Sequence, residues 1–250
     1  MKLFKTTTLA SALLAIISTS VFADETVKDI DPSDMTRANT SMYVAASNQG
    51  EIKASGSLSY TYQNGQMSMV TLEGTMDKEG KYADSRLQYF HVFNLNNAVT
   101  PRIAASLDII DNKNFTTAAA GGIAIFRTPI DSLTFFGRAA VLGGEYSDQA
   151  TSAFNVTDSG IIGGMAAAYA VLNTGQDGTY FALYPEFTYL DGDIETSTVK
   201  STFLAATPLS ADKTRWGQFK IENTFGSMES TTTKVDIDET VAWFQYKVFF

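Results

Sequence analysis

The chain contains no cysteine, a single histidine and only five prolines in 250 residues. The absence of cysteine excludes disulfide bonds, thiol catalysis and cysteine-ligated metal centres, and one histidine leaves little room for a polyhistidine site. We therefore expect neither a metal ion nor a cofactor. The sequence also lacks an apolar run of about 18 residues, which argues against a bundle of transmembrane helices. A membrane protein of this composition would have to be built from strands.

Positive charge is also scarce. The formal net charge is −9, with 18 basic against 27 acidic residues. Binding to nucleic acid needs clusters of basic residues that neutralise phosphates, and the sequence has none. We therefore exclude nucleic acid as a partner.

The first 23 residues have the pattern of a secretory signal peptide. Lys2 and Lys5 form a positive region, residues 9–17 are apolar, and Val21 and Ala23 supply the small residues that signal peptidase accepts. We predict cleavage after Ala23 and export of the protein.

The remaining chain alternates apolar and polar residues with a period of two, as strands do. In residues 51–62 the apolar face carries Ile52, Ala54, Leu58, Tyr60 and Tyr62. Similar alternation recurs in residues 103–109, 180–189 and 217–225. These runs approach the 9–11 residues of a tilted membrane-spanning strand, whereas strands of soluble proteins average about 5–6.

The spacing of the runs predicts the fold class, an all-β transmembrane antiparallel up-and-down barrel of about 12 strands, although 10 or 14 would also fit. The expected strands are 39–48, 51–63, 66–77, 84–95, 101–111, 114–127, 131–144, 159–173, 178–190, 197–207, 213–226 and 238–250. The longest links are Glu145 to Asp158 and Gly226 to Ile237. Pro185 falls inside a strand, where we expect a bulge because proline donates no ladder hydrogen bond.

The last strand carries an alternating aromatic and apolar pattern that ends on the terminal residue. Phe244, Tyr246, Val248 and Phe250 share one face. This pattern resembles the C-terminal signal of Gram-negative outer-membrane β-barrel proteins. The resemblance implies recognition by the barrel-assembly machinery, residence in the cell outer membrane, and contact with lipid and lipopolysaccharide.

The expected organisation has three parts. Residues 1–23 are the signal peptide, 24–38 a periplasmic N-terminal segment, and 39–250 the barrel. The N-terminal segment has no alternation, so it either hangs in the periplasm or folds into the barrel mouth. We expect a monomer.

The polar face of the strands carries charges of both signs. Lysine or arginine facing lipid near the midplane would cost about 2–4 kcal/mol, so the shared parity of these charges assigns them to the interior. The predicted lumen-lining residues are Lys53, Glu73, Arg86, Asp108, Arg138, Glu186, Lys200, Lys220, Glu222 and Lys247.

The sequence offers no catalytic constellation. Outer-membrane phospholipase A has a serine two residues after its catalytic histidine, but Val92 and Phe93 follow His91, the sole histidine here. No carboxylate adjoins His91 in the sequence to orient it. We therefore expect that the protein is not an enzyme.

Two functions remain. The polar interior favours a small passive, porin-like channel for small hydrophilic solutes. The alternative is a structural or adhesion barrel at the cell surface, with a closed lumen and extracellular loops that contact a ligand. The sequence leaves open whether the lumen is open or plugged.

Overall fold

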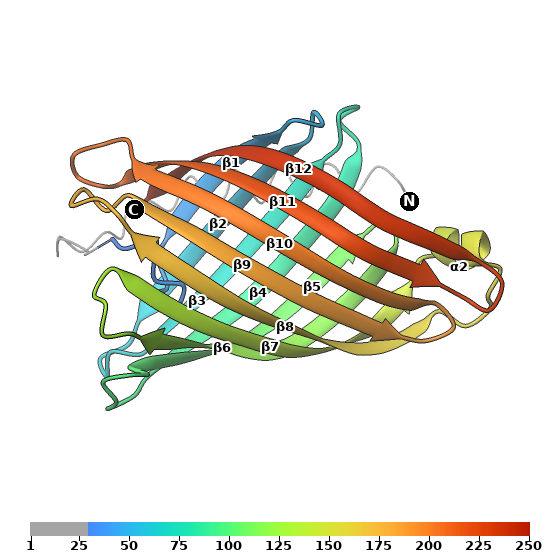
Figure 1. The fold of residues 1–250 in the computed structure, drawn as a ribbon, viewed down its shortest axis with the longest axis horizontal. Helices are drawn as coiled ribbons and strands as arrows, with labels where there is room; N and C mark the ends of the chain where they lie inside the picture. Colours follow the sequence, from blue (N-terminus) through green and yellow to red (C-terminus); the bar gives the residue numbers. More distant parts are fainter. Residues whose placement is uncertain (1–29) are drawn as a thin grey trace.

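The computed structural model describes residues 30–250, which form a closed barrel of twelve antiparallel strands (Figure 1). The predicted signal peptide, residues 1–23 with cleavage after Ala23, lies outside the described residues. The strands are β1 (Ser41–Ser47), β2 (Ile52–Thr61), β3 (Met67–Met76), β4 (Tyr82–Asn94), β5 (Arg102–Asn112), β6 (Phe115–Arg127), β7 (Leu133–Tyr146), β8 (Gly160–Asn173), β9 (Tyr180–Asp191), β10 (Glu195–Pro208), β11 (Arg215–Glu229) and β12 (Lys234–Phe249). Within residues 30–250, no helix is both long enough and apolar enough to cross a membrane.

The first and last strands close the barrel. In the ladder between β1 and β12, Ser41 lies opposite Phe249 and Ser47 lies opposite Trp243. Every other strand pairs with its two neighbours in sequence. Closure removes the open sheet edges that would otherwise pair with other chains. The prediction of an up-and-down barrel is confirmed, with twelve strands rather than ten or fourteen.

The two faces of the wall differ as the alternation predicts. On β5, Ile103 and Leu107 lie on the outer face, and Leu107 is 59% exposed. Ala104, Ser106 and Asp108 on the same strand point inward and are buried. The barrel therefore has an apolar outer surface, and its inner face combines polar residues such as Ser106 and Asp108 with buried apolar clusters.

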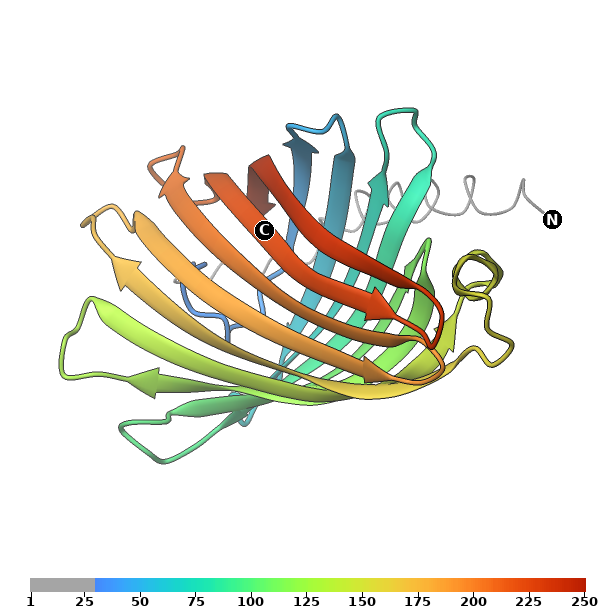
Figure 2. The ribbon, with the colours of Figure 1, turned by 45° about the vertical axis from the view of Figure 1, so that its right-hand side comes forward.

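The barrel has two distinct ends. We call the end where β1 begins and β12 ends the terminal mouth, and the opposite end the helix mouth, because the helix α2 (Asp148–Phe154) lies there (Figure 2). Most links at the terminal mouth are short turns held by their own side chains. In one of them Asp212 accepts hydrogen bonds from Ser210 Oγ at 2.5 Å and Thr214 N at 3.1 Å. These hydrogen bonds lower the pKa of Asp212 to about 2, and the bond from Ser210 contributes most. The Asp212 carboxylate therefore stays charged at neutral pH.

The predicted bulge at Pro185 is wrong. In the ladder between β8 and β9, Ala167 lies opposite Glu186 and Ala170 lies opposite Leu183, with an unpaired stretch between them. Both strands contain the same number of residues across this gap, so the register does not shift. Pro185 lacks the N–H group that would donate a hydrogen bond toward β8. The ladder from β9 to β10 continues without interruption.

The two longest predicted links also differ from the structure. The link from Glu145 to Asp158 contains α2, whose first turn is capped by Ser147 Oγ accepting from the Ala150 N–H at 3.2 Å. The link from Gly226 to Ile237 is mostly strand, because β11 and β12 extend to a short turn over residues 230–233. Alternation fades there as charged residues accumulate, which is why the sequence suggested a loop.

Glycines allow the wall to bend around β6 to β8, at the lower edge of the barrel in Figure 1. A Cβ atom on Gly144 would lie 2.1 Å from the carbonyl oxygen of Thr116. One on Gly163 would lie 2.0 Å from the carbonyl oxygen of Tyr189. The backbones of neighbouring strands approach too closely here for any side chain, which permits sharp curvature.

Candidate functional site

The barrel interior is the candidate functional site, and the ten charged residues predicted to face the lumen all lie on the inner face. They come from nine strands, and most are half-buried. The inward residues are Lys53, Glu73, Arg86, Asp108, Arg138, Glu186, Lys200, Lys220, Glu222 and Lys247. That they line a conducting lumen stays a prediction.

One half of this interior is a chain of ion pairs between β2 and β7. Lys53 Nζ lies 3.5 Å from Glu73 Oε1, and Glu73 also faces Arg86 across the ladder of β3 and β4. The Arg86 Nε donates to Asp108 Oδ1 at 2.6 Å. Asp108 Oδ2 in turn lies 3.7 Å from Arg138. Charges of alternating sign therefore follow one another from strand to strand.

The other half continues the alternation from β9 to β11. Lys200 Nζ lies 3.4 Å from Glu186 Oε1, its direct cross-strand partner. Lys220 Nζ lies 3.0 Å from Glu222 Oε1 on the same strand. Arg138 lies close enough to Glu186 to interact with it electrostatically, and so joins the two halves. We call these nine residues, which exclude Lys247, the charged belt.

An aromatic ring completes the charged belt between β11 and β2. Lys53 Nζ lies 5.1 Å and Lys220 Nζ 5.8 Å from the centre of the Trp243 ring on β12. Both are cation–π distances. Lys247 stands apart from the belt, 4.8 Å from the centre of the Phe249 ring and nearer the terminal mouth.

The charged belt borders open space. The side chain of Lys200 is 39% exposed and that of Arg86 is 31% exposed, although both point into the barrel. The Asp108 side chain is only 1% exposed, because it is enclosed by its arginine and glutamine neighbours. The cationic groups therefore reach into a space that admits water, while Asp108 supports them from the wall.

Residues 30–40, the N-terminal strap, cross the terminal mouth. Asp34 forms an ion pair with Arg102 at the start of β5, and Arg102 Nε donates to Thr36 Oγ1 at 3.0 Å. On the other side, Tyr180 of β9 donates to the Pro32 carbonyl oxygen at 3.2 Å. The sequence left two courses open for the N-terminal segment, in the periplasm or in the barrel mouth. Residues 30–37 lie in the barrel mouth.

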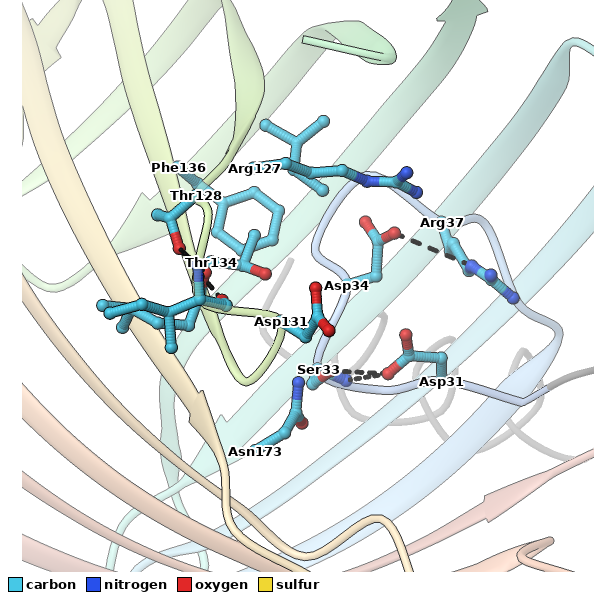
Figure 3. A pocket seen from close by; sticks show the side chains of 13 residues that line it. Asp31, Ser33, Asp34, Arg37, Arg127, Thr128, Asp131, Thr134, Phe136 and Asn173 are labelled. Carbon is cyan, nitrogen blue, oxygen red and sulfur yellow. Dashed lines mark hydrogen bonds and ion pairs between the residues drawn. The ribbon is translucent and has the colours of Figure 1, made fainter. Parts of the chain in front are cut away.

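The strap leaves a cavity of about 280 Å³ beside the link between β6 and β7 (Figure 3). Asp34 and Arg37 of the strap and Arg127 and Asp131 of the wall contribute charged groups to it. Arg37 Nε lies 3.7 Å from Asp34 Oδ2. The strap therefore occupies part of the terminal mouth, with Ile30 and Met35 packed against apolar residues of the inner wall, and leaves this cavity beside it.

The helix mouth is narrowed by α2. The apolar residues Ala150 and Phe154 of the helix are buried against Leu190 and Ile194 beside the other wall. Ser230 Oγ donates to the Phe154 carbonyl oxygen at 3.1 Å, which ties the helix to the turn between β11 and β12. Sequence reasoning missed this helix, because seven residues without a clear apolar period give little signal.

A polar cluster on the outer face was also missed. His91 Nδ1 lies 2.7 Å from Ser68 Oγ, its cross-strand partner on β3, and His91 Nε2 lies 3.2 Å from Gln66 Oε1. Tyr62 and Tyr89 place their hydroxyls 3.2 and 3.1 Å from Ser68 Oγ. His91 thus has a serine partner that no local motif could reveal, because it comes from the neighbouring strand.

The described residues provide no metal centre. Within residues 30–250, no group of three or more histidine, aspartate or glutamate side chains is placed to hold a metal ion. The acidic groups of the charged belt are instead engaged by lysine and arginine.

Comparison with known proteins places this fold among small outer-membrane channels. No family model matches the chain, and no curated protein matches its sequence. Among solved structures, the NanC porin is similar with a TM-score of 0.60 at 10% identity, over 84% of this chain and 99% of that one. The KdgM porin is similar with a TM-score of 0.52 at 10% identity, and the coverage of both chains is the same as for NanC. The COG4313 outer membrane channel from Pseudomonas putida F1 is similar with a TM-score of 0.57 at 12% identity, over 89% of this chain and 100% of that one.

These similarities define the class by fold: this closed barrel of twelve strands has the architecture of solved porins. At 10–12% identity they establish the architecture only. The particular solute must be inferred from the side chains of this chain.

Proposed function

We propose that the protein is a small passive channel in the outer membrane of a Gram-negative cell, through which small hydrophilic solutes diffuse. The observation that carries this proposal is the charged belt, whose lysine and arginine side chains reach into open space inside a closed barrel. A polar, water-filled interior within an apolar outer wall is the arrangement of porins. The chemistry required is diffusion past fixed charges, so no catalytic role is assigned.

Three features support the location in the outer membrane. The outer face is apolar, the similar solved structures are outer-membrane porins, and the N-terminal sequence has the pattern of a signal peptide cleaved after Ala23. Phe244, Tyr246 and Phe250 are exposed at the C-terminal strand, where the assembly machinery would read them. In this setting the partners of the barrel are lipid and lipopolysaccharide, and each barrel acts as a monomer.

A second function is favoured by the two narrowed mouths. If the N-terminal strap and α2 together close the passage, the protein is a structural or adhesion barrel whose surface loops contact a ligand. The strap contacts β5 and β9, and α2 is packed against the opposite end. The exposed side chains of Lys200 and Arg86 inside the barrel favour the channel, because a fully packed interior would bury them.

Planar-bilayer recording tests the proposal. The refolded barrel is added to a lipid bilayer in potassium chloride, and the current is recorded at fixed voltage. A channel gives discrete openings of uniform size. Folded protein that inserts without any openings would refute the channel and leave the surface barrel.

A further inference from the structure

The polar cluster on the outer face brings a serine into contact with the sole histidine of the chain. Ser68 Oγ lies 2.7 Å from His91 Nδ1, and His91 Nε2 lies 3.2 Å from Gln66 Oε1. The amide oxygen of Gln66 only accepts hydrogen bonds, so Nε2 carries the ring proton and Nδ1 accepts from Ser68. A hydroxyl, a neutral histidine and a group that orients the histidine form the arrangement of serine hydrolases. Here Nδ1 rather than Nε2 faces the serine, and either nitrogen can act as the base.

Two tyrosine hydroxyls surround this serine. Those of Tyr62 and Tyr89 lie 3.2 and 3.1 Å from Ser68 Oγ. When both donate to its two lone pairs, the Ser68 proton is directed to His91. Ser68 is 8% exposed, whereas Tyr62, which follows β2 in the turn, is 41% exposed. Rotation of the Tyr62 ring toward the membrane therefore uncovers one lone pair of Ser68, and Tyr89 stays beside it as a donor.

The position of the cluster indicates which molecules it meets. Ser68 and His91 are cross-strand partners close to the turn between β2 and β3, which lies at the terminal mouth. Tyr60 lies opposite Ser68 and is 65% exposed, and the Phe93 ring centre lies 4.5 Å from that of His91. Exposed aromatic side chains gather where lipid headgroups meet the hydrocarbon core. The ester groups of phospholipids lie at this same level of a membrane.

We propose that Ser68 and His91 are the catalytic residues of an acyl hydrolase that cleaves phospholipid esters in the leaflet at the terminal mouth. Ser68 Oγ attacks the ester carbonyl carbon, and its proton passes to His91 Nδ1. The bond between the acyl carbon and the glycerol oxygen breaks, and the glycerol oxygen leaves with that proton. Water then cleaves the acyl-serine by the same steps, which releases a fatty acid and restores Ser68.

Two neighbours support this reaction. The Tyr89 hydroxyl donates to the carbonyl oxygen as negative charge develops on it. Gln66 is a positioning residue that holds the His91 ring and touches no substrate. The expectation that the protein is not an enzyme rested on the residues next to His91 along the chain, whereas Ser68 reaches it from the adjacent strand. The proposed activity goes beyond the channel, because its site lies on the outside of the wall.

The test measures ester cleavage without current. The full barrel is refolded from inclusion bodies, which removes host lipases, into mixed micelles of detergent and phosphatidylethanolamine. We expect fatty acid and lysophospholipid to appear in equal amounts. A fluorophosphonate, which reacts with activated serines, is applied to the same preparation, and peptide mass spectrometry should locate its adduct at Ser68.

Variants assign the activity to the serine and the histidine. Ser68→Ala and His91→Gln should each lower kcat about a hundredfold or more, because each removes the proton transfer from the hydroxyl to the ring. Ser85→Ala is the matched control. Ser85 also lies on the outer face, with its Oγ 2.8 Å from the Tyr82 hydroxyl, but the sole histidine contacts Ser68 instead. This variant should cleave the lipid as the parent does.

The supporting groups are tested separately. Tyr89→Phe should lower kcat with little change in KM, because the donor acts on charge that develops only during the reaction. Gln66→Ala should do the same, and Gln66→Glu, which keeps an acceptor oxygen for His91, should restore activity. If Ser68→Ala does not fold, the adduct in the parent and the kcat of Tyr89→Phe decide.

The outcomes separate this proposal from the channel. A folded parent that releases no fatty acid and forms no adduct at Ser68 overturns the hydrolase, and leaves the cluster as a membrane anchor. Cleavage that persists in Ser68→Ala, or equal loss in Ser85→Ala, overturns it as well. A barrel that cleaves lipid but never conducts overturns the channel alone, and one that conducts without cleavage overturns the hydrolase alone.

Discussion

Replacing Leu107 with arginine tests which face of the barrel wall meets lipid. Leu107 lies on the outer face of β5 and is 59% exposed, so its side chain would be surrounded by lipid tails in a membrane. An arginine on the lipid face of a barrel costs about 2–4 kcal/mol near the midplane. We expect Leu107→Arg to lower the free energy of unfolding by this amount in liposomes, measured by urea titration of tryptophan fluorescence.

The matched control places the same residue on the inner face at nearly the same depth. Gln88 lies opposite Asp108 on the neighbouring strand, and its Nε2 donates to Asp108 Oδ1 at 3.0 Å. An arginine there keeps a donor for the same carboxylate. Gln88→Arg should therefore change the free energy of unfolding by no more than about 0.5–1 kcal/mol. Equal losses in the two variants would refute the assignment of lipid-facing and lumen-facing sides.

Three further variants test the terminal mouth, the assembly signal and the charged belt. Arg102→Ala removes the ion pair that anchors the N-terminal strap, so single-channel conductance should rise, and an unchanged conductance would show that the strap does not narrow the passage. Deletion of Phe250 together with Tyr246→Ser should leave unfolded protein in the periplasm, whereas normal heat-modifiable migration from outer-membrane fractions would contradict a role in assembly. Asp108→Ala leaves two arginines without their shared carboxylate, so urea titration should show a loss of about 3 kcal/mol, and stability equal to the parent would mean that lumen water already satisfies both.

The strand number and the two faces were predictable, because each depends on a local pattern. Period-two alternation assigns Leu107 and Asp108 to opposite faces without knowledge of their neighbours. A turn such as that at Asn64 and Gly65 is equally local, since glycine there adopts a positive φ of 77°. The ends of β11 and β12 were missed because charged side chains are tolerated on both faces of a strand beyond the apolar band.

The pairing inside the barrel was not predictable, because it depends on register. Parity places Glu73, Arg86 and Asp108 inside, but only the stagger between strands sets them at one height. The same limit hid Ser68, which reaches His91 from the adjacent strand. The course of the N-terminal strap depends on contacts with residues far along the chain, such as Tyr180.

The energetics of the charged belt favour an aqueous lumen over a closed interior. Removing a charge from water costs several kcal/mol even when it is paired, and apolar residues of similar volume would serve a closed core at least as well. The barrel instead keeps these nine charges around its inner face, with Lys200 and Arg86 reaching into open space. Water retained around these groups reduces their desolvation cost. The charged belt therefore destabilises a barrel with a solvated lumen less than it would destabilise a barrel with a closed interior. In the proposed channel, the strap and α2 would narrow the two mouths, and the belt would be the surface that a solute meets between them.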